Sequence, residues 1–173
     1  LGIAPWNAPV ILGIRAIAAP LACGNTVVLK ASELCPQVHE LIIDLLHRAG
    51  LPQGTACIVT NTPEEAADTV ESLVSHTAIR RVNFTGSTRV GRLVAETCAR
   101  HLKPAILELS GKAALIVRPD ADLARAAEAA AYGAFFNQGQ VCISTERIVA
   151  DIQIADAFVA NLAERATGLT AGD

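Results

Sequence analysis

The stretch TVVLKASELCPQVHELIIDLLHRAGLPQGTACIV, residues 26–59, holds two short apolar runs on either side of a helical pattern. The runs 26–29 and 56–59 are bounded by turn residues or charges, and each predicts a buried strand. Between them, Pro36 suits a first helical turn and Gly50 ends the helix. A strand, a helix and a second strand in this order are typical of a parallel α/β sheet. The expected apolar face of the helix comprises Val38, Leu41, Ile42, Leu45, Leu46 and Ala49.

The same alternation of strand and helix patterns continues through the rest of the chain. Further strands are expected at 81–84, 104–108, 114–117 and 145–150, and further helices at 9–23, 64–74, 90–101, 120–136 and 155–166. This order predicts an α/β fold with a parallel sheet. The character of the sequence changes near Ser110-Gly111-Lys112, so we expect one domain over 1–110 and the start of another over 111–173.

Composition excludes several classes of function. The 173 residues are 51% hydrophobic and carry 14 basic and 17 acidic side chains, for a formal charge of −3. This weak negative charge gives no reason to expect nucleic acid or an anionic membrane as a partner. The sequence shows no signal-peptide pattern and no uninterrupted apolar run of membrane-spanning length. Because the chain begins with Leu1 and ends at Asp173, we expect an internal segment. The widely spaced cysteines, with no disulfide pattern, indicate reduced thiols in a cytoplasmic protein.

The cysteines and histidines do not form a metal-ligand pattern. The five cysteines are widely spaced, and neither a Cys-x-x-Cys pair nor a Cys/His cluster occurs, so no metal is expected. We expect reduced thiols, of which Cys23, Cys35, Cys57 and Cys98 are small core residues. The four histidines, His39, His47, His76 and His101, are expected on the surface or at helix ends.

One carboxylate and one thiol stand in unusual surroundings. Glu108 interrupts a short apolar run, where an unpaired buried carboxylate is costly, so it must be paired, exposed at a strand end, or functional. Cys142 follows a glycine-containing turn, and the backbone amides of such a turn stabilise a thiolate. The alternative for Cys142 is an ordinary core thiol.

Three further segments have the chemistry of binding sites. The strand–turn–helix at 84–91, which contains Gly86, Ser87 and Gly91, presents free backbone N–H groups that suit a phosphate or form an ordinary helix cap. Lys30 and Glu33 follow a strand at the edge where ligands of open α/β sheets collect, although a solvated pair is an equal alternative. The segment Trp6-Asn7 lies between two prolines, and Asn7 either donates to an oxyanion or caps the helix at 9–23.

Together these motifs resemble the NAD(P)-dependent aldehyde dehydrogenases in order and spacing. The matching motifs are Pro5-Trp6-Asn7-x-Pro9, Lys30-x-x-Glu33, Phe84-Thr85-Gly86-Ser87-Thr88, Leu107-Glu108-Leu109-x-Gly111-Lys112 and Gly139-Gln140-x-Cys142. The segments 80–84 and 137–147 are most similar to the branch that acts on aromatic aldehydes such as salicylaldehyde, benzaldehyde or vanillin. The resemblance implies the later part of a Rossmann-like NAD-binding domain over 1–110 and the truncated start of the catalytic domain over 111–173, with the active site in a cleft between domains.

The resemblance also implies a role for each matched residue. Cys142 is the expected nucleophile, Glu108 the base that activates water, and Asn7 an oxyanion donor. The aldehyde becomes a carboxylic acid through a thiohemiacetal and a thioester. Glu33 implies NAD rather than NADP. The residues expected around the cofactor are Trp6, Lys30, Glu33, Gly86, Ser87, Gly91 and Leu109, and those around the substrate are Arg15, Phe136 and Ile143.

The sequence departs from the family pattern at three places. Ser110 stands where the family has a glycine, and its side chain is a concern if that position needs a positive φ. Residues 61–63, Asn-Thr-Pro, replace a more glycine-rich turn near the adenine. Arg15 replaces an aromatic residue of the substrate tunnel and is either a surface charge or a cation that binds the phenol oxygen of an aromatic aldehyde.

Two other functions compete with aldehyde oxidation. An acylating relative would use the same cysteine but pass the acyl group to another acceptor, and Glu108 disfavours it because only hydrolysis needs a water base. An inactive homologue with a binding role is hinted at by Ser110 alone. The full-length protein is expected to form a homo-oligomer, and residues 1–173 alone are expected to show no turnover.

Overall fold

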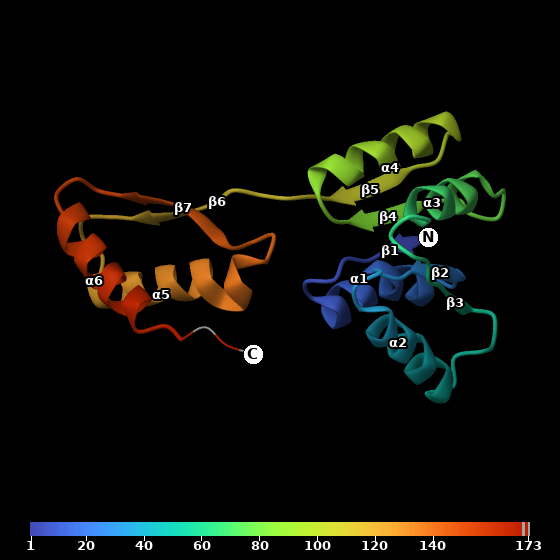
Figure 1. Cartoon of the computed structure of the whole chain (residues 1–173), viewed down its shortest axis with the longest axis horizontal. Coiled ribbons are helices and arrows are strands. Elements are labelled where there is room, and N and C mark those ends of the chain that lie inside the picture. Colours follow the sequence, from blue (N-terminus) through green and yellow to red (C-terminus); the bar gives the residue numbers. More distant parts are fainter. Residues whose placement is uncertain (171, 173) are drawn as a thin grey trace. The chain divides into compact units, whose positions relative to one another are not determined.

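The computed structural model describes residues 1–170 and 172. The chain divides into two compact units, Leu1–Ser110 and Gly111–Asp173, and each is described by itself. The first unit consists of a parallel sheet with helices on both faces, and the second of a smaller parallel sheet with helices on one face (Figure 1). The expected α/β class is confirmed.

The strands and helices of the first unit alternate along the chain. The elements are β1 (Gly2–Ile3), α1 (Pro9–Ala22), β2 (Val27–Lys30), α2 (Pro36–Arg48), β3 (Ala56–Val59), α3 (Ala66–Ser75), β4 (Val82–Thr85), α4 (Thr88–Arg100) and β5 (Ala105–Glu108). Strand β1 was not predicted, because two residues carry no readable periodicity. It is nevertheless central, since Gly2 pairs with Leu29 of β2 on one side and with Asn83 of β4 on the other.

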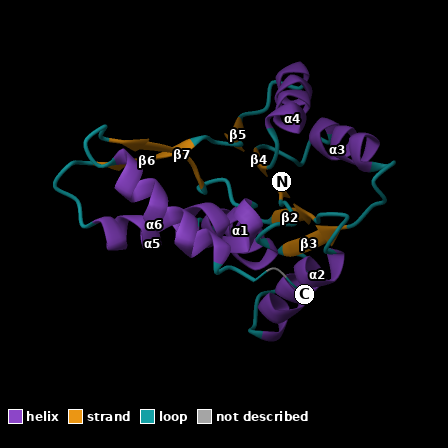
Figure 2. Ribbon diagram, turned by 60° about the vertical axis from the view of Figure 1, so that its left-hand side comes forward, coloured by secondary structure: helices purple, strands orange, loops and turns teal. Residues whose placement is uncertain are grey.

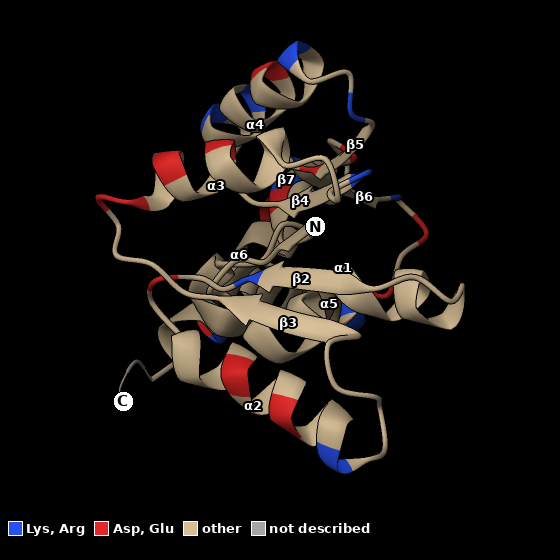
Figure 3. Ribbon diagram, turned by 90° about the vertical axis from the view of Figure 1, so that its right-hand side faces the viewer, with Lys and Arg blue, Asp and Glu red and all other residues tan. Residues whose placement is uncertain are grey.

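The sheet of residues 1–110, all of which are described, runs in the order β3-β2-β1-β4-β5, and its strand pairs are parallel. The chain moves outward from β1 to β3 and then returns to β4, so the order reverses between β1 and β4. Helices α1 and α2 cover one face of the sheet, and α3 and α4 cover the other (Figure 3). In such sheets, ligands bind outside the carboxyl ends of the strands at this reversal point.

Each face of the sheet has its own apolar core. One core joins α1 and α2 to β2 through Ile17, Leu29 and Ile42, and the other joins α3 and α4 to β4 through Val74 and Val94. Helix α1 lies so close to β1 that a Cβ placed on Gly2 would be 2.9 Å from the Cβ of Ala16. The small residues at these two positions therefore allow the helix to contact the sheet.

The buried face of α2 differs from the predicted one. Leu41 and Leu45 are 52% and 49% exposed, whereas His39, Ile42 and Ile43 are buried. These three residues follow the i, i+3, i+4 spacing of one helix face, one position away from the predicted set. The expectation that His39 lies on the surface or at a helix end is therefore wrong.

The expectation of four core cysteines is also wrong. Cys98 is buried, but Cys23 and Cys57 are exposed and Cys35 is half-buried. Cys23 follows the end of α1, and Cys57 lies on β3, which is an edge strand with one neighbour. All five thiols are free, as expected.

The second unit is a strand–helix–strand–helix arrangement. It comprises β6 (Ala113–Val117), α5 (Leu123–Phe135), the 3₁₀ turn η1 (Phe136–Gly139), β7 (Thr145–Ala150) and α6 (Ala155–Thr167). Strands β6 and β7 pair in parallel, and both helices lie on one face of them (Figure 2). The core between the layers includes Val117, Ala127, Ala130 and Phe158.

The ends of the helices follow the sequence chemistry. The Asp122 carboxylate accepts the N–H groups of Ala124 and Arg125 at the start of α5, as expected for an N-cap. Among the described residues, no helix is both long and apolar enough to cross a membrane.

Candidate active site

The predicted site residues of the first unit gather at the carboxyl edge of the sheet. Lys30, Thr85 and Glu108 are the last residues of β2, β4 and β5. Thr85 is paired with Glu108 in the register, and Ile3, at the end of β1, is paired with Lys30. Because these strands are parallel, the segments that follow them leave the sheet on the same side.

Lys30 and Glu33 form a sheltered ion pair at this edge. The ammonium Nζ of Lys30 contacts Oε1 of Glu33, and the exposed fractions of the two side chains are 6% and 20%. Asn61, just past β3, donates its side-chain Nδ2 to the same carboxylate oxygen at 3.0 Å. Burial raises the pKa of the Glu33 carboxyl. The hydrogen bonds from Lys30, from the Glu33 backbone N–H and from Asn61 outweigh burial, so the pKa lies below its ordinary value.

The Lys30–Glu33 segment packs against the buried side chain of His39. The N–H of Ser32 donates to Nδ1 of His39 at 3.2 Å, so the ring is neutral and its proton is on Nε2. The Nε2 atom has no hydrogen-bond partner among the described residues. On the other side of the ring, a Cβ placed on Gly13 of α1 would lie 2.9 Å from Cδ2. His39 thus packs between the loop after β2 and α1.

The turn between β4 and α4 combines a helix cap with close packing. The Ser87 hydroxyl accepts the N–H of Val90 at 3.3 Å and caps α4, while the N–H of Gly86 donates to the Glu108 carbonyl at 3.0 Å. A Cβ placed on Gly91 would lie 2.4 Å from Cδ2 of Leu109. The glycine at 91 therefore lets the Leu109 side chain lie against α4, and the first turn of α4 has backbone N–H groups without partners inside the helix.

Trp6 and Asn7 lie in the segment between β1 and α1. Trp6 is 46% exposed, and its carbonyl lies 4.0 Å from the thiol of Cys35. The N-cap position of α1 is Ala8, whose side chain makes no capping hydrogen bond. Asn7 immediately precedes it, and its position just past the central strand places it at the same edge of the sheet.

Glu108 is paired with Arg15, the residue that stands where the family has an aromatic residue of the substrate tunnel. Nη2 of Arg15 lies 3.4 Å from Oε2 of Glu108, and the side chains are 58% and 41% exposed. Arg15 therefore contacts the proposed base and is not an isolated surface charge. Ser110, two residues further on, is exposed and is not among the residues with a positive φ. The backbone conformation at 110 therefore accommodates a serine side chain.

Cys142 lies in the second unit, in the irregular segment before β7. Asn137 and Gln138 have φ values of 52° and 54°, and Gly139 has 71°, so three successive residues are left-handed. Such a conformation is costly for Gln and Asn and is characteristic of functional loops. A Cβ placed on Gly111 would lie 3.0 Å from the carbonyl oxygen of Cys142. Glycine at 111 thus permits the backbone after residue 110 to lie close to the backbone at Cys142.

The apolar residues near Cys142 are exposed within the second unit. Phe136 and Ile143 are 55% and 77% exposed. Phe136 contacts Tyr132 with ring centroids 5.2 Å apart. It also lines a groove of about 1020 Å³ between α5 and α6, whereas Ile143 does not. The charges of Lys112 and Glu146 pair across the start of the two strands.

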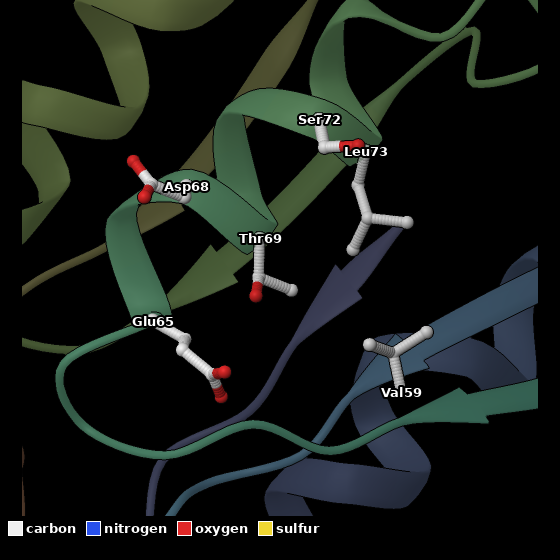
Figure 4. Close-up of a pocket in the computed structure, with 6 residues that line it drawn as sticks. All are labelled: Val59, Glu65, Asp68, Thr69, Ser72 and Leu73. Atoms are coloured by element: carbon white, nitrogen blue, oxygen red, sulfur yellow. The ribbon is translucent and has the colours of Figure 1, made fainter.

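A second hollow lies in the first unit, between the end of β3 and α3 (Figure 4). Its volume is about 460 Å³, and it is lined by Val59, Glu65, Asp68, Thr69, Ser72 and Leu73. None of the predicted site residues lines it. Among the described residues, no group of three or more His, Cys, Asp or Glu side chains is placed to hold a metal ion.

Sequence reasoning assigned no role in the site to two residues of the sheet edge, Asn61 and His39. Asn61 was noted only as part of a turn that departs from the family pattern near the adenine, and it lies two residues past the edge strand β3, where ligands of such sheets collect. His39 shares a helix face with Ile42 and Ile43, and that spacing was the available signal for burial.

Comparisons with known proteins agree with this geometry. Residues 1–173 match the aldehyde dehydrogenase family. A vanillin dehydrogenase from Pseudomonas fluorescens is 64% identical over the whole chain, which covers 36% of that protein, and a salicylaldehyde dehydrogenase from Pseudomonas sp. (strain C18) is 50% identical, with the same coverage.

The structure of a salicylaldehyde dehydrogenase from Pseudomonas putida G7, complexed with salicylaldehyde, superimposes with a TM-score of 0.97 at 49% identity, over 99% of this chain and 36% of the other. The chain thus spans about a third of the length of these relatives. It belongs to the aldehyde dehydrogenase family.

Proposed function

We propose that the protein containing this chain oxidises an aromatic aldehyde to its carboxylic acid, with NAD as electron acceptor. The observation that carries the proposal is the grouping of the Lys30–Glu33 pair, the capped N-terminus of α4 and Glu108 at one edge of the sheet. The aromatic substrate is supported by the names of the relatives, which are vanillin and salicylaldehyde dehydrogenases.

The residues of Leu1–Ser110 fit a dinucleotide. A sheltered carboxylate at 33 can accept the hydroxyl donors of the adenosine ribose, and it disfavours the extra phosphate of NADP. The backbone N–H groups around Gly86 and Ser87 suit the pyrophosphate, because a helix N-terminus carries a partial positive charge. Trp6, Gly91 and Leu109 complete the proposed cofactor set. When bound, NAD supplies the acceptor for the hydride that leaves the substrate.

The proposed chemistry begins at Cys142. Its thiolate adds to the aldehyde carbon and forms a thiohemiacetal, whose oxyanion takes hydrogen bonds from the Asn7 side chain and the Cys142 backbone N–H. Loss of hydride from that carbon leaves a thioester. Glu108 then removes a proton from a water molecule, which attacks the thioester carbon and releases the carboxylic acid and the thiol. A general base at 108 distinguishes hydrolysis from acyl transfer to another acceptor.

Arg15, Phe136 and Ile143 are the proposed substrate residues. The apolar pair Phe136 and Ile143 supplies contact area for an aromatic ring. Arg15 supplies a charged donor for a phenol oxygen. We further propose that Leu1–Ser110 provides the cofactor site and Gly111–Asp173 the nucleophile, and that residues 1–173 alone give no measurable turnover.

The test is a steady-state assay of the full-length protein with vanillin, salicylaldehyde, benzaldehyde and an aliphatic aldehyde, each with NAD and NADP. We expect NADH and the matching carboxylate, with kcat/KM higher for the aromatic aldehydes and for NAD, and no product from Cys142→Ala. Exposed Cys23 offers a matched control, and Cys23→Ala should retain activity. Equal turnover by Cys142→Ala and the wild type would overturn the proposal.

A further inference from the structure

Asn61 is bound to the carboxylate of the proposed ribose site from a distant part of the chain. Its Nδ2 donates to Oε1 of Glu33 at 3.0 Å, across 28 residues of sequence. Lys30, the last residue of β2, contacts the same oxygen. Two donors, one at the end of β2 and one past the end of β3, therefore converge on one carboxylate oxygen, and neither of them binds the other oxygen, Oε2.

The orientation of the Asn61 amide follows from the charge beside it. If the amide were turned over, Oδ1 would face the Glu33 carboxylate and repel it, so the NH₂ group must point toward Glu33. In this orientation Oδ1 is buried and, within the described part of the chain, has no hydrogen-bond partner. A buried acceptor without a partner is costly. The hydrogen bond from Asn61 to Glu33 therefore forms at the cost of leaving Oδ1 without a partner among the described residues.

Hydrogen bonds hold the turn that carries Asn61 in one conformation. The backbone N–H and the hydroxyl of Thr62 both donate to Oε2 of Glu65, each at 3.1 Å. The amide of Asn61 also donates to the carbonyl of Thr62 at 2.6 Å. Glu65 stands at the start of α3, where Figure 4 shows it beside the hollow. The side chain of Asn61 is therefore positioned before any ligand arrives.

We propose that Asn61 is a positioning residue that sets the preference for NAD over NADP by holding the Glu33 carboxylate in place. This inference rests on the proposed function. An amide suits the task because it donates a hydrogen bond without adding positive charge. The Lys30–Glu33–Asn61 group has no net positive charge to attract a 2′-phosphate, and the anchored carboxylate repels one while it accepts ribose hydroxyls.

The test measures dissociation constants of NAD and NADP for the full-length protein by calorimetry. Asn61→Ala should weaken NAD binding by about tenfold, the effect of a lost hydrogen bond to a charged group, and NADP binding less. Asn61→Asp preserves the volume but places a second carboxylate beside Glu33, so the loss of NAD affinity should be larger. At saturating NAD, kcat should stay at the wild-type value, because the residue acts on cofactor binding alone.

A double-mutant cycle shows whether Asn61 acts through Glu33. In Glu33→Gln protein, Asn61→Ala should leave the ratio of the NAD and NADP constants unchanged. Asn25→Ala is the matched control, since the Asn25 amide bonds only to nearby carbonyls at the end of α1.

Two results would overturn this inference and leave the proposed function intact. One is unaltered NAD and NADP affinities in both Asn61 variants. The other is an equal effect of Asn61→Ala on the ratio of the NAD and NADP constants in wild-type and Glu33→Gln protein. If the wild-type protein binds neither nucleotide, the proposed function itself fails.

Discussion

Nη2 of Arg15 lies 3.4 Å from Oε2 of Glu108, so the first helix meets the last strand of the Leu1–Ser110 sheet at the proposed base. Both side chains are more than two-fifths exposed, and pairs of this kind contribute about 0–1 kcal/mol to stability. The contact is therefore of little value for folding. The contact instead holds the guanidinium near the carboxylate that is proposed to deprotonate water. The other N–H groups of the guanidinium can donate to a substrate oxygen.

Replacing Arg15 should affect hydroxylated substrates selectively. In Arg15→Ala, we expect KM for salicylaldehyde or vanillin to rise about tenfold, because a charge-assisted hydrogen bond to the phenol oxygen is lost, and KM for benzaldehyde to change little. The measurement is steady-state kinetics with the three aldehydes at saturating NAD. Arg48→Ala is the control, since Arg48 pairs only with Asp44 on the surface of α2. Equal changes in KM for all three aldehydes would rule out a contact with the phenol oxygen.

Gly91→Ala should lower the free energy of unfolding of the cofactor-free protein. The new methyl group would lie 2.4 Å from Cδ2 of Leu109, so the Leu109 side chain must turn away from α4, at a cost of about 1 kcal/mol, the low end for overpacking because the end of a side chain can move. Urea unfolding of the cofactor-free protein measures the loss. Gly168→Ala is a suitable control, because the nearest atom to its Cβ is 3.5 Å away and its φ is not positive. Unchanged stability together with weaker NAD binding would mean that Gly91 acts by contacting the cofactor and not through packing.

Buried His39 should make the folded state sensitive to acid. Burial lowers the pKa of its imidazole, the Pro9 carbonyl opposes this, and the charge of Lys30 adds to the lowering. In the unfolded chain a histidine titrates near pH 6.5, so below that pH the unfolded state takes up the proton first. The free energy of unfolding should then fall as pH drops below about 6.5, by at most about 1.4 kcal/mol per pH unit, until the folded-state pKa is reached.

The His39 contribution can be separated from that of the other histidines. His47 acts in the opposite direction, because the carbonyls of Leu51 and Ala56 raise its pKa and its contribution is lost only as pH rises through that value. In His39→Asn the amide oxygen can still accept the Ser32 N–H but cannot titrate. Urea unfolding at pH 5.5 and 7.5 should show a smaller acid loss for His39→Asn than for the wild type or for exposed His76→Asn. The same acid loss in all three proteins would exclude His39 as its source.

Most of the fold could be predicted from the sequence, because strands such as 56–59 and helices such as 36–48 carry strong local patterns. Strand β1 could not, since Gly2 and Ile3 become a strand only through the partners on both sides. The exposure of Leu41 and the burial of His39 were harder to predict, although the spacing of His39, Ile42 and Ile43 indicates a second possible buried face. They depend on which side of α2 faces α1 and the sheet, and the apolar pattern of α2 is broad enough to allow either of two adjacent faces.

The candidate site was predictable where neighbouring residues act together, as with Lys30 and Glu33. It was not predictable where the contact joins distant segments. The bond from Asn61 to Glu33 and the pair between Arg15 and Glu108 span 28 and 93 residues, and only the parallel sheet order brings them together. The roles of Cys142, Glu108 and Asn7 remain predictions, as does the homo-oligomer.

The most direct test of the central claim is the fate of the acyl group in Glu108→Gln. Full-length protein carrying this change is mixed with benzaldehyde and NAD, quenched in acid and examined by peptide mass spectrometry. We predict a burst of NADH stoichiometric with enzyme, a benzoyl group on Cys142, and thioester hydrolysis slowed by about 10²–10⁴-fold, the usual contribution of a general base. Hydrolysis of the thioester at the wild-type rate, or an acyl group on any other residue, would contradict the account.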